Sequence, residues 1–198
     1  MAVNRKPILK TCRELGISPM VMGVGKETKR DPNAGKRKKV SEYGMQLKEK
    51  QKLRFIYGVL EKQFYHTFEI AQKMEGQAGE NLITCLESRL DNVAFRMDAA
   101  LTRREARQLV AHGHFLVNGK RVDIPSYSVK VGDVISLSEK SKKSEKFKQI
   151  AEGTADRLTP AWLDVNKEQG SAKVLRAPVK EDLDYEVEEH LIVELYSK

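Results

Sequence analysis

Cysteine and long apolar segments are both scarce in this sequence, and each shortage excludes a class of protein. The 198 residues include only two cysteines, Cys12 and Cys85, and no CxxC spacing. Two such cysteines predict neither a disulfide framework nor a zinc site. No run of about 18 apolar residues predicts a transmembrane helix, and the N-terminal stretch lacks the apolar core of a secretory signal. We therefore expect a protein of the reducing cytoplasm with no membrane partner.

Histidine is also scarce, and its spacing indicates no catalytic or metal centre. His66, His112, His114 and His190 lack the spacing of metal ligands. No serine–histidine–aspartate arrangement and no pair of carboxylates for acid–base chemistry stands out along the chain. We expect no catalytic residue, no metal, no cofactor and no small-molecule substrate.

Positive charge, by contrast, is abundant and unevenly distributed. The formal net charge is +8 and the pI is about 9.4, which suits a nucleic acid or an anionic membrane surface as partner. Residues 1–54 hold fifteen Lys or Arg against five Asp or Glu, a net charge of +10, which leaves −2 for the rest. A basic arm is thus joined to a nearly neutral body.

The first 40 residues show little hydrophobic periodicity and are interrupted by prolines and glycines. We expect them to be irregular, ordered mainly by a partner, and to add little to a core. Within them Lys36, Arg37, Lys38 and Lys39 form a compact basic cluster, which is either a binding segment or a solubilising linker.

Residues 41–97 carry a helical pattern. A polar, helix-favouring stretch over 41–52 is followed by apolar residues at steps of three or four, which predict a core-facing stripe. The stripe comprises Ile56, Leu60, Phe64, Phe68 and Ala71. After a break at 76–79, residues 80–97 predict two helices end to end. Their inward residues are Leu82, Leu86, Leu90, Val93 and Met97.

The clearest local signals lie between residues 102 and 121. Thr102 and Glu105 predict a capping box, in which the Thr102 hydroxyl accepts from the Glu105 amide and the Glu105 carboxylate reaches the Thr102 amide. Gly113 is placed to end the helix with a positive φ angle. Residues 114–117 predict a strand, and Asn118-Gly119 predicts a tight hairpin turn.

Arginines at the start of this helix are the most informative residues. Arg103, Arg104 and Arg107 place positive charge at the positive end of the helix dipole. Each exposed charge of this kind lowers the stability of the helix by roughly 0.3–1 kcal/mol. A polyanion across the helix start would reverse that sign, because amides, dipole and guanidinium groups would then all point at phosphate. The alternative is an ordinary solvated helix face.

The rest of the chain predicts further strands and one short helix. Residues 124–131 and 134–137 alternate as strands, residues 139–153 form a charged helix or linker, and residues 162–165 pair with 172–175 in a hairpin. The final helix, residues 187–195, is too short to be stable alone and must dock. We expect Leu191 and Leu195 to pack near Ile56, Leu60 and Phe64.

The sequence from residue 89 to 120 resembles the small RNA-binding module of small-subunit ribosomal protein four, a module also used by RNA-modifying enzymes. The matching residues are Arg89-Leu90-Asp91, Arg96, residues 102–110, His112-Gly113-His114 and Val117-Asn118-Gly119-Lys120. The resemblance to this ribosomal family extends to residues 41–58, 79–93, 124–127 and 189–198. Many members carry four N-terminal cysteines that bind zinc, whereas this chain has only Cys12 there and resembles the zinc-free version.

The predicted fold class is α+β: a discontinuous helical domain, an inserted small α/β RNA-binding module of two helices and short antiparallel strands, and a basic irregular N-terminal arm. We expect the arm over 1–40 and the helical domain over 41–87, completed by 178–198. The RNA-binding module is expected over 88–150, extended by a hairpin over 151–177.

The resemblance implies a structural component of the small ribosomal subunit, located in the cytoplasm, that binds 16S ribosomal RNA and nucleates assembly. It also implies contact with ribosomal proteins three and five, with mRNA at the entry channel, and an effect on translational accuracy. Alternatives are a stand-alone RNA-binding factor and an RNA-modifying enzyme that uses the same module.

The candidate RNA-binding residues are mostly basic and fall in three groups. They are Lys36, Arg37, Lys38 and Lys39 in the arm; Lys48, Lys50, Lys52 and Arg54 in the helical domain; and Arg89, Arg96, Thr102, Arg103, Arg104, Arg107, Gln108, His112, His114, Asn118, Lys120 and Arg121 in the module. Glu181, Asp182, Asp184 and Glu186 form an acidic run that suits a basic protein neighbour.

Overall fold

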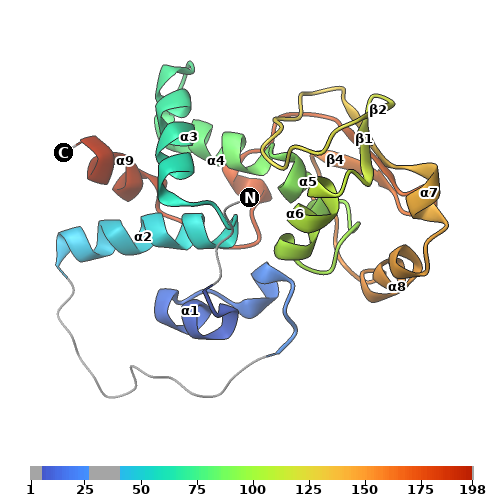
Figure 1. Ribbon diagram of the computed structural model, residues 1–198. Coiled ribbons are helices and arrows are strands. Elements are labelled where there is room, and N and C mark those ends of the chain that lie inside the picture. The colour runs from blue at the N-terminus through green and yellow to red at the C-terminus, as the bar shows by residue number, and fades with distance from the viewer. Residues whose placement is uncertain (1–5, 27–40, 198) are drawn as a thin grey trace. The chain divides into compact units, whose positions relative to one another are not determined.

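A computed structural model describes residues 6–26 and 41–197 (Figure 1). It combines α-helices with one antiparallel sheet, which confirms the predicted α+β class. The described residues belong to two compact units, one within Met1–Leu82 and Leu183–Lys198, the other Ile83–Asp182. The first unit is therefore discontinuous in sequence, and the second is inserted into it.

The N-terminal residues contain regular structure that their composition conceals. Helix α1 (Ile8–Leu15) ends at Gly16, whose φ of 72° places it in the left-handed region, and a 3-10 helix η1 (Pro19–Met22) follows. Their apolar residues are buried: Cys12, Leu15, Ile17, Val21 and Met22. The expectation of irregular backbone with little core is therefore wrong over residues 8–22, because α1 has an apolar face that the surrounding charge and glycines mask. The basic cluster at residues 36–39 lies outside the described residues.

Helices α2 (Glu42–Ile56) and α3 (Glu61–Lys73) form the centre of the first unit. Ser41 caps α2, since its hydroxyl accepts a hydrogen bond from the Gly44 amide at 3.2 Å. The predicted stripe is buried at Ile56, Phe64, Phe68 and Ala71. Leu60 is the exception: it precedes the first turn of α3 and is 37% exposed.

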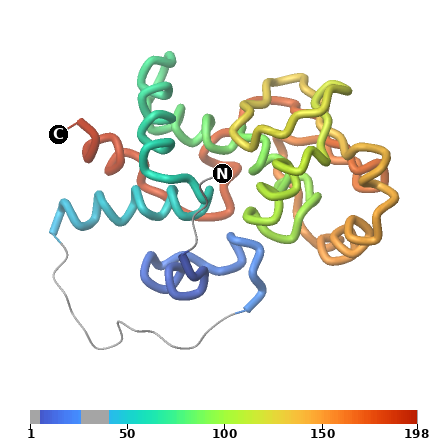
Figure 2. The backbone as a smooth tube through the Cα atoms, viewed as in Figure 1, coloured from blue at the N-terminus to red at the C-terminus, as the bar shows by residue number. Residues whose placement is uncertain are grey.

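The C-terminal helix α9 (Glu189–Ser197) docks onto this unit, as its short length required. It packs along α2, and Figure 2 shows this red segment beside the cyan tube of α2. The buried anchor is Ile192, with no exposed surface, whereas Leu191 and Leu195 remain partly exposed. The most buried apolar residue of α9 is therefore Ile192, and the expectation that Leu191 and Leu195 pack near Ile56, Leu60 and Phe64 stays a prediction. Tyr196 adds a ring contact, 4.7 Å from the Phe68 centroid.

The second unit begins within α4 (Ala78–Glu87) and continues through α5 (Leu90–Arg96) and α6 (Arg103–Ala111). The predicted pair of helices end to end is confirmed by α4 and α5, and their expected inward residues are all buried. Helices α7 (Glu139–Lys142) and α8 (Glu145–Gly153) occupy the stretch for which a helix or a linker was expected, and a 3-10 turn η2 covers Lys180–Asp182.

One five-stranded antiparallel sheet completes this unit, in the order β2-β1-β3-β5-β4. The strands are β1 (Phe115–Val117), β2 (Lys120–Arg121), β3 (Val134–Leu137), β4 (Leu163–Asn166) and β5 (Ser171–Val174). Phe115 pairs with Leu137, and Ile135 with Ala172, so alternate residues share the buried face. The predicted C-terminal hairpin is confirmed and joins the sheet through the β3–β5 pairing.

Residues 124–131 do not form the predicted strand. Their backbone instead pairs with the residues that lead into α5: the Leu90 amide donates to the Tyr127 carbonyl at 2.8 Å, and the Val129 amide donates to the Ser88 carbonyl at 2.9 Å. Only an isolated bridge between Arg89 and Ser128 has strand geometry. The buried Pro125 cannot donate to a ladder, but its carbonyl accepts from the Asp91 amide. The alternating pattern therefore reflects a loop packed against the start of α5.

Candidate nucleic-acid interface

Helix α6 begins with the predicted cap at Thr102, although the Glu105 carboxylate bonds a different amide from the one expected. The Thr102 hydroxyl accepts from the Glu105 amide at 3.2 Å, as expected. The Glu105 carboxylate accepts from the Leu101 amide at 3.0 Å, not from the Thr102 amide. The cap therefore also holds the residue before Thr102 and orders the loop that leads into α6.

The three arginines of α6 occupy different environments. Arg103 is buried: its Nε donates to Asn92 Oδ1 at 3.1 Å, and its guanidinium lies 4.4 Å from the Phe95 ring centroid. Arg107 is partly buried and donates to Asp91 Oδ2 at 3.2 Å. Arg104 alone of the three is exposed. The predicted cluster of three guanidinium groups is therefore not a continuous exposed surface.

Two buried carboxylates bind Arg89 and Arg96, two further arginines of the module. Asp91 accepts two hydrogen bonds from Arg89, at 3.1 and 2.8 Å, in addition to that from Arg107. Glu87 accepts from Arg96 at 3.2 and 3.1 Å. Because Arg89 and Arg96 are at most 8% exposed, these predicted RNA-binding residues are partners within the fold.

The hairpin after α6 brings further basic side chains close to the C-terminal end of that helix. Asn118 and Gly119 have φ angles of 48° and 79°, as the predicted tight turn requires. The Asn118 amide group bonds Asp133 and the Val134 amide, so it stabilises the sheet. Arg121 Nη2 donates to the His112 carbonyl at 3.2 Å. Gly113, with a φ of 74°, leaves room for this guanidinium, since a Cβ there would lie 2.1 Å from Arg121 Nε.

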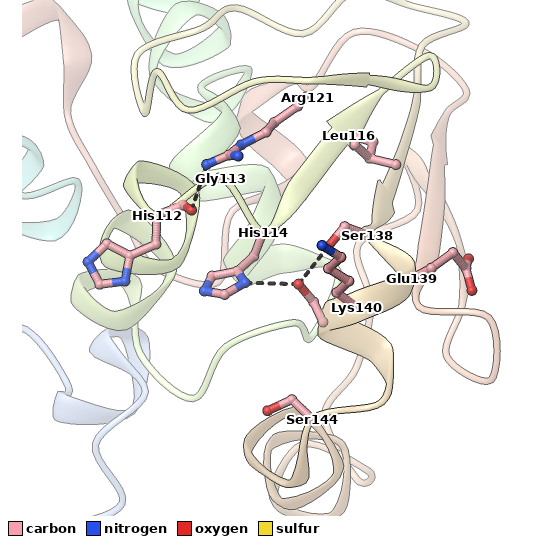
Figure 3. Close-up of a pocket in the computed structure, with 10 residues that line it drawn as sticks. His112, Gly113, His114, Leu116, Arg121, Ser138, Glu139, Lys140 and Ser144 are labelled. Carbon is pink, nitrogen blue, oxygen red and sulfur yellow. Dashed lines mark hydrogen bonds between the residues drawn. The ribbon is translucent and has the colours of Figure 1, made fainter.

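The exposed polar residues along α6, just after its C-terminal end and on β2 together form a surface that we call the basic rim. They come from α6, its C-terminal end and β2: Arg104, Gln108, His112, Lys120 and Arg121. Beside the rim lies a cavity of about 600 Å³, in which His114 and serines of the α7 and α8 starts face one another (Figure 3). His114 Nδ1 is hydrogen-bonded to Ser141 Oγ at 2.8 Å, which is in turn 2.7 Å from Ser138 Oγ.

Sequence reasoning missed the residues on the far side of this cavity: Ser138, Lys140, Ser141 and Ser144. Ser138 and Ser144 occupy the N-cap positions of α7 and α8, and serine before a helix was the available signal. Nothing local, however, indicates that these helices begin opposite His114.

The predicted basic residues of α2 differ in whether they form ion pairs. Lys50 lies 2.7 Å from Glu61 Oε1, Arg54 pairs with Glu61 Oε2, and Lys52 lies 2.7 Å from Glu49. Lys48 is exposed. Burial alone would raise the pKa of the Glu61 carboxyl, but hydrogen bonds from Lys50, Arg54 and Tyr196 together hold that pKa below its ordinary value. Three of these four basic residues are therefore bound to carboxylates of the same unit.

The acidic residues expected at a protein interface are also not equivalent. Asp182 makes two bonds to Arg176, at 2.7 and 2.6 Å, and accepts from the Val179 amide at 3.0 Å. Glu181, Asp184 and Glu186 are exposed. Asp182 thus shapes the local chain, while the other three present negative charge at the surface.

Among residues 6–26 and 41–197, no group of three or more histidine, cysteine, aspartate or glutamate side chains has the arrangement of a metal site. In the same ranges, no helix has the length and apolar character needed to cross a membrane.

Comparison with known proteins finds two family models that follow one another along the chain. Residues 4–87 match the ribosomal protein S4/S9 N-terminal domain, and residues 88–135 match the S4 domain. A protein of Lachnospira eligens named small ribosomal subunit protein uS4 is 55% identical over 199 residues, covering all of both chains. Proteins of the same name from Clostridioides difficile and Acetivibrio thermocellus are 59% and 60% identical over 162 residues, which cover 82% of this chain and 78% of theirs.

Proposed function

Because the chain belongs to the family of small ribosomal subunit protein uS4, we propose that it is a structural constituent of the small ribosomal subunit and binds 16S ribosomal RNA there. It acts as a binding protein and not as an enzyme, and its place is the bacterial cytoplasm. As a primary binder it would nucleate the assembly of the subunit.

The basic rim is the observation that carries this proposal. Exposed Arg104 lies in the first turn of α6, and exposed Lys120 and Arg121 lie on the hairpin that follows the helix, so phosphate groups can approach all three from solvent. Three other arginines serve the fold. Arg103, bonded to Asn92, links α6 to α5, whereas Arg89, bonded to Asp91, and Arg96, bonded to Glu87, stabilise α5 and its junction with α4.

The salt dependence of RNA binding tests the rim directly. Each phosphate contact adds to the slope of log affinity against log salt, by roughly 0.7 for single strands and 0.9 for duplexes. Arg104→Gln, Lys120→Gln and Arg121→Gln should each flatten the slope by a little under one unit for the 5′ domain of 16S ribosomal RNA. Lys62→Gln, at an exposed lysine of α3, is the matched control and should leave the slope unchanged. Equal slopes for all four variants would refute the rim as the phosphate-binding surface.

Sedimentation distinguishes a ribosomal constituent from a free RNA-binding factor. The protein should remain with small subunits through a salt wash that removes loosely bound factors. Recovery only in the unbound fraction would contradict the proposed role.

The acidic residues support a second contact, with a basic protein neighbour. Glu181, Asp184 and Glu186 are exposed and unsuited to RNA, and the family resemblance suggests ribosomal protein five, with ribosomal protein three and the mRNA entry channel nearby. Charge reversal at these three residues should leave binding to isolated RNA intact and change the miscoding rate of assembled ribosomes. Unchanged miscoding on a near-cognate reporter would remove this contact and its effect on accuracy.

A further inference from the structure

We infer that the cavity beside the basic rim is a site for one unpaired nucleotide of the bound RNA, with its phosphate toward Arg121 and Lys140 and its base against His114. This inference rests on the proposed RNA-binding function and specifies what one part of that surface recognises. The cavity is lined by the end of α6, by β1 and β2, and by the starts of α7 and α8 (Figure 3).

Its size suits a nucleotide better than a lone phosphate. The volume of about 600 Å³ falls within the roughly 300–1,000 Å³ of small-ligand pockets. The lining also mixes apolar and polar groups, since Leu116 contributes carbon surface and three serines contribute hydroxyls. A nucleotide has both an apolar ring face and a polar edge, and so matches this mixture.

A chain of hydrogen bonds fixes the orientation of the His114 ring. Ser138 Oγ lies 2.7 Å from Ser141 Oγ, which lies 2.8 Å from His114 Nδ1. Ser141 is only 4% exposed, so this chain is shielded from competing water. On its other side the ring meets Phe147 edge-on, with centroids 5.4 Å apart. Nδ1 is thereby occupied, which leaves Nε2 to bond a ligand.

The protonation state of His114 favours a base over a second anion as its partner. Partial burial lowers the pKa of the imidazole, and the neighbouring His112, Lys146 and Arg121 lower it further. A neutral imidazole at neutral pH can donate or accept one hydrogen bond at the edge of a base. The His112 ring lies 6.2 Å from that of His114 at 55°, and adds a second aromatic surface at the mouth.

The cations at the mouth supply the complementary site for phosphate. Arg121 is held against Gly113 by its bond to the His112 carbonyl, and Lys140, in the first turn of α7, is exposed and also lines the cavity. The one acidic residue in the lining, Glu139, bonds Lys142 at 2.8 Å, and its side chain points away from His114 in Figure 3. The electrostatic balance at the mouth is therefore positive.

Filling the cavity from its edge provides the first test. Ser144 is exposed and its side chain makes no cap hydrogen bond, so Ser144→Trp should fold normally and occupy the cavity. Loss of one stacked base should weaken binding to the 5′ domain of 16S ribosomal RNA about tenfold, the equivalent of about 1.4 kcal/mol. Because the phosphate of the excluded nucleotide also loses its contacts with Arg121 and Lys140, the salt slope should flatten by a little under one unit, as for Arg121→Gln. Ser126→Trp, at an exposed serine outside the cavity, is the control and should bind normally. Equal affinities for the two tryptophan variants would refute the site.

Nuclear magnetic resonance of the full chain with labelled histidine rings provides the second test. Saturating single-stranded RNA should shift the His114 ring signals, and inorganic phosphate at the same concentration should not. An unshifted His114 alongside shifted α6 amides would refute the nucleotide site and leave RNA binding intact; no shift at either would refute the proposed function itself. If adenosine monophosphate bound as tightly as RNA, the site would serve a free nucleotide and the assignment to RNA would be wrong.

Discussion

Each unit of this protein contains a glutamate whose carboxylate accepts hydrogen bonds from several side chains, yet the two glutamates differ in burial. Glu61, in the first unit, accepts from Lys50, Arg54 and Tyr196, and its side chain is 45% exposed. Glu87, in the second unit, accepts from Arg96 and Asn92, and its side chain is 1% exposed. The contacts are similar in number and kind, but only the second set is removed from water.

This difference shows why basic residues with similar surroundings in the sequence have different roles. An exposed pair contributes little, because water and salt compete for both charges. Removing one partner of a buried pair lowers stability strongly, because the charge left alone in the interior is strongly disfavoured. In the second unit, arginines near an RNA-binding surface therefore serve the fold, and the exposed rim remains for RNA.

Removing the buried carboxylate should have the largest effect. Glu87→Gln breaks the buried ion pair with Arg96, whose side chain is 8% exposed, and should cost about 3–5 kcal/mol of unfolding free energy. Glu61→Gln, the matched change in the first unit, should cost less than about 1 kcal/mol. Urea unfolding of both variants, followed by circular dichroism, gives the comparison. Similar losses for the two would show that burial does not separate these sites.

Shortening apolar side chains of α9 should show how strongly apolar packing, rather than buried charge, stabilises the first unit. Ile192 is fully buried, so Ile192→Ala should cost about 2–5 kcal/mol. Leu195 is partly exposed and Leu195→Ala should cost clearly less. Thermal unfolding of both single variants measures the difference. A larger loss at Leu195 would return the anchoring role to the residue that the sequence pattern favoured.

The pH dependence of Glu61 should distinguish its contribution from simple packing. Because the folded pKa of Glu61 is depressed, its contribution to stability is present above the ordinary carboxyl value and is lost as pH falls through the folded pKa. Wild type should therefore be more stable than Glu61→Gln at pH 7, and the gap should be smaller at an acidic pH below the ordinary carboxyl pKa. A gap that is the same at both pH values would rule out an electrostatic origin.

Asp98 in the second unit should show the opposite sign and the smallest effect. Burial raises the pKa of Asp98, although Lys167 at 3.0 Å and Arg157 oppose the rise. A raised folded pKa favours the folded state at low pH, and this contribution is lost as pH rises through that pKa. Lys167 also donates to three backbone carbonyls, and asparagine tolerates the φ of 64° at this position. Asp98→Asn should thus be neutral or stabilising by about 1 kcal/mol at pH 7.

Chemical denaturation at pH 7 and below pH 4 checks this last prediction, because the stability of the wild type should rise relative to that of Asp98→Asn as pH falls. Asp98→Ala serves as a control for the backbone, because alanine disfavours a positive φ and should be less stable than Asp98→Asn at both pH values. A large loss for Asp98→Asn at pH 7 would show that the Asp98–Lys167 pair is required.

Signals that depend on neighbouring residues could be predicted from the sequence, and the structure confirms them. Thr102 caps α6, Gly113 ends it, and Asn118-Gly119 turns the hairpin, because each depends on backbone geometry within a few residues. The short C-terminal helix had to dock, since a helix of this length is not stable in water alone. The resemblance to the family likewise depends on residues that lie close together in the sequence, between residues 89 and 120.

Only the tertiary structure decided which of the equivalent residues are buried. Arg103 and Arg104 are adjacent arginines at one helix start, yet Asn92 and Phe95 surround the first while the second faces solvent. Ile192 rather than Leu191 or Leu195 is fully buried in α9, because the rotation of a helix about its axis depends on the surface that receives it. Residues 124–131 alternate like a strand, but their carbonyls are used by the start of α5. The cavity at His114 likewise exists because α7 and α8 begin beside it, which no local pattern specifies. In each case the deciding partner lies outside the local window, so free energies of desolvation and packing settle what the sequence pattern left open.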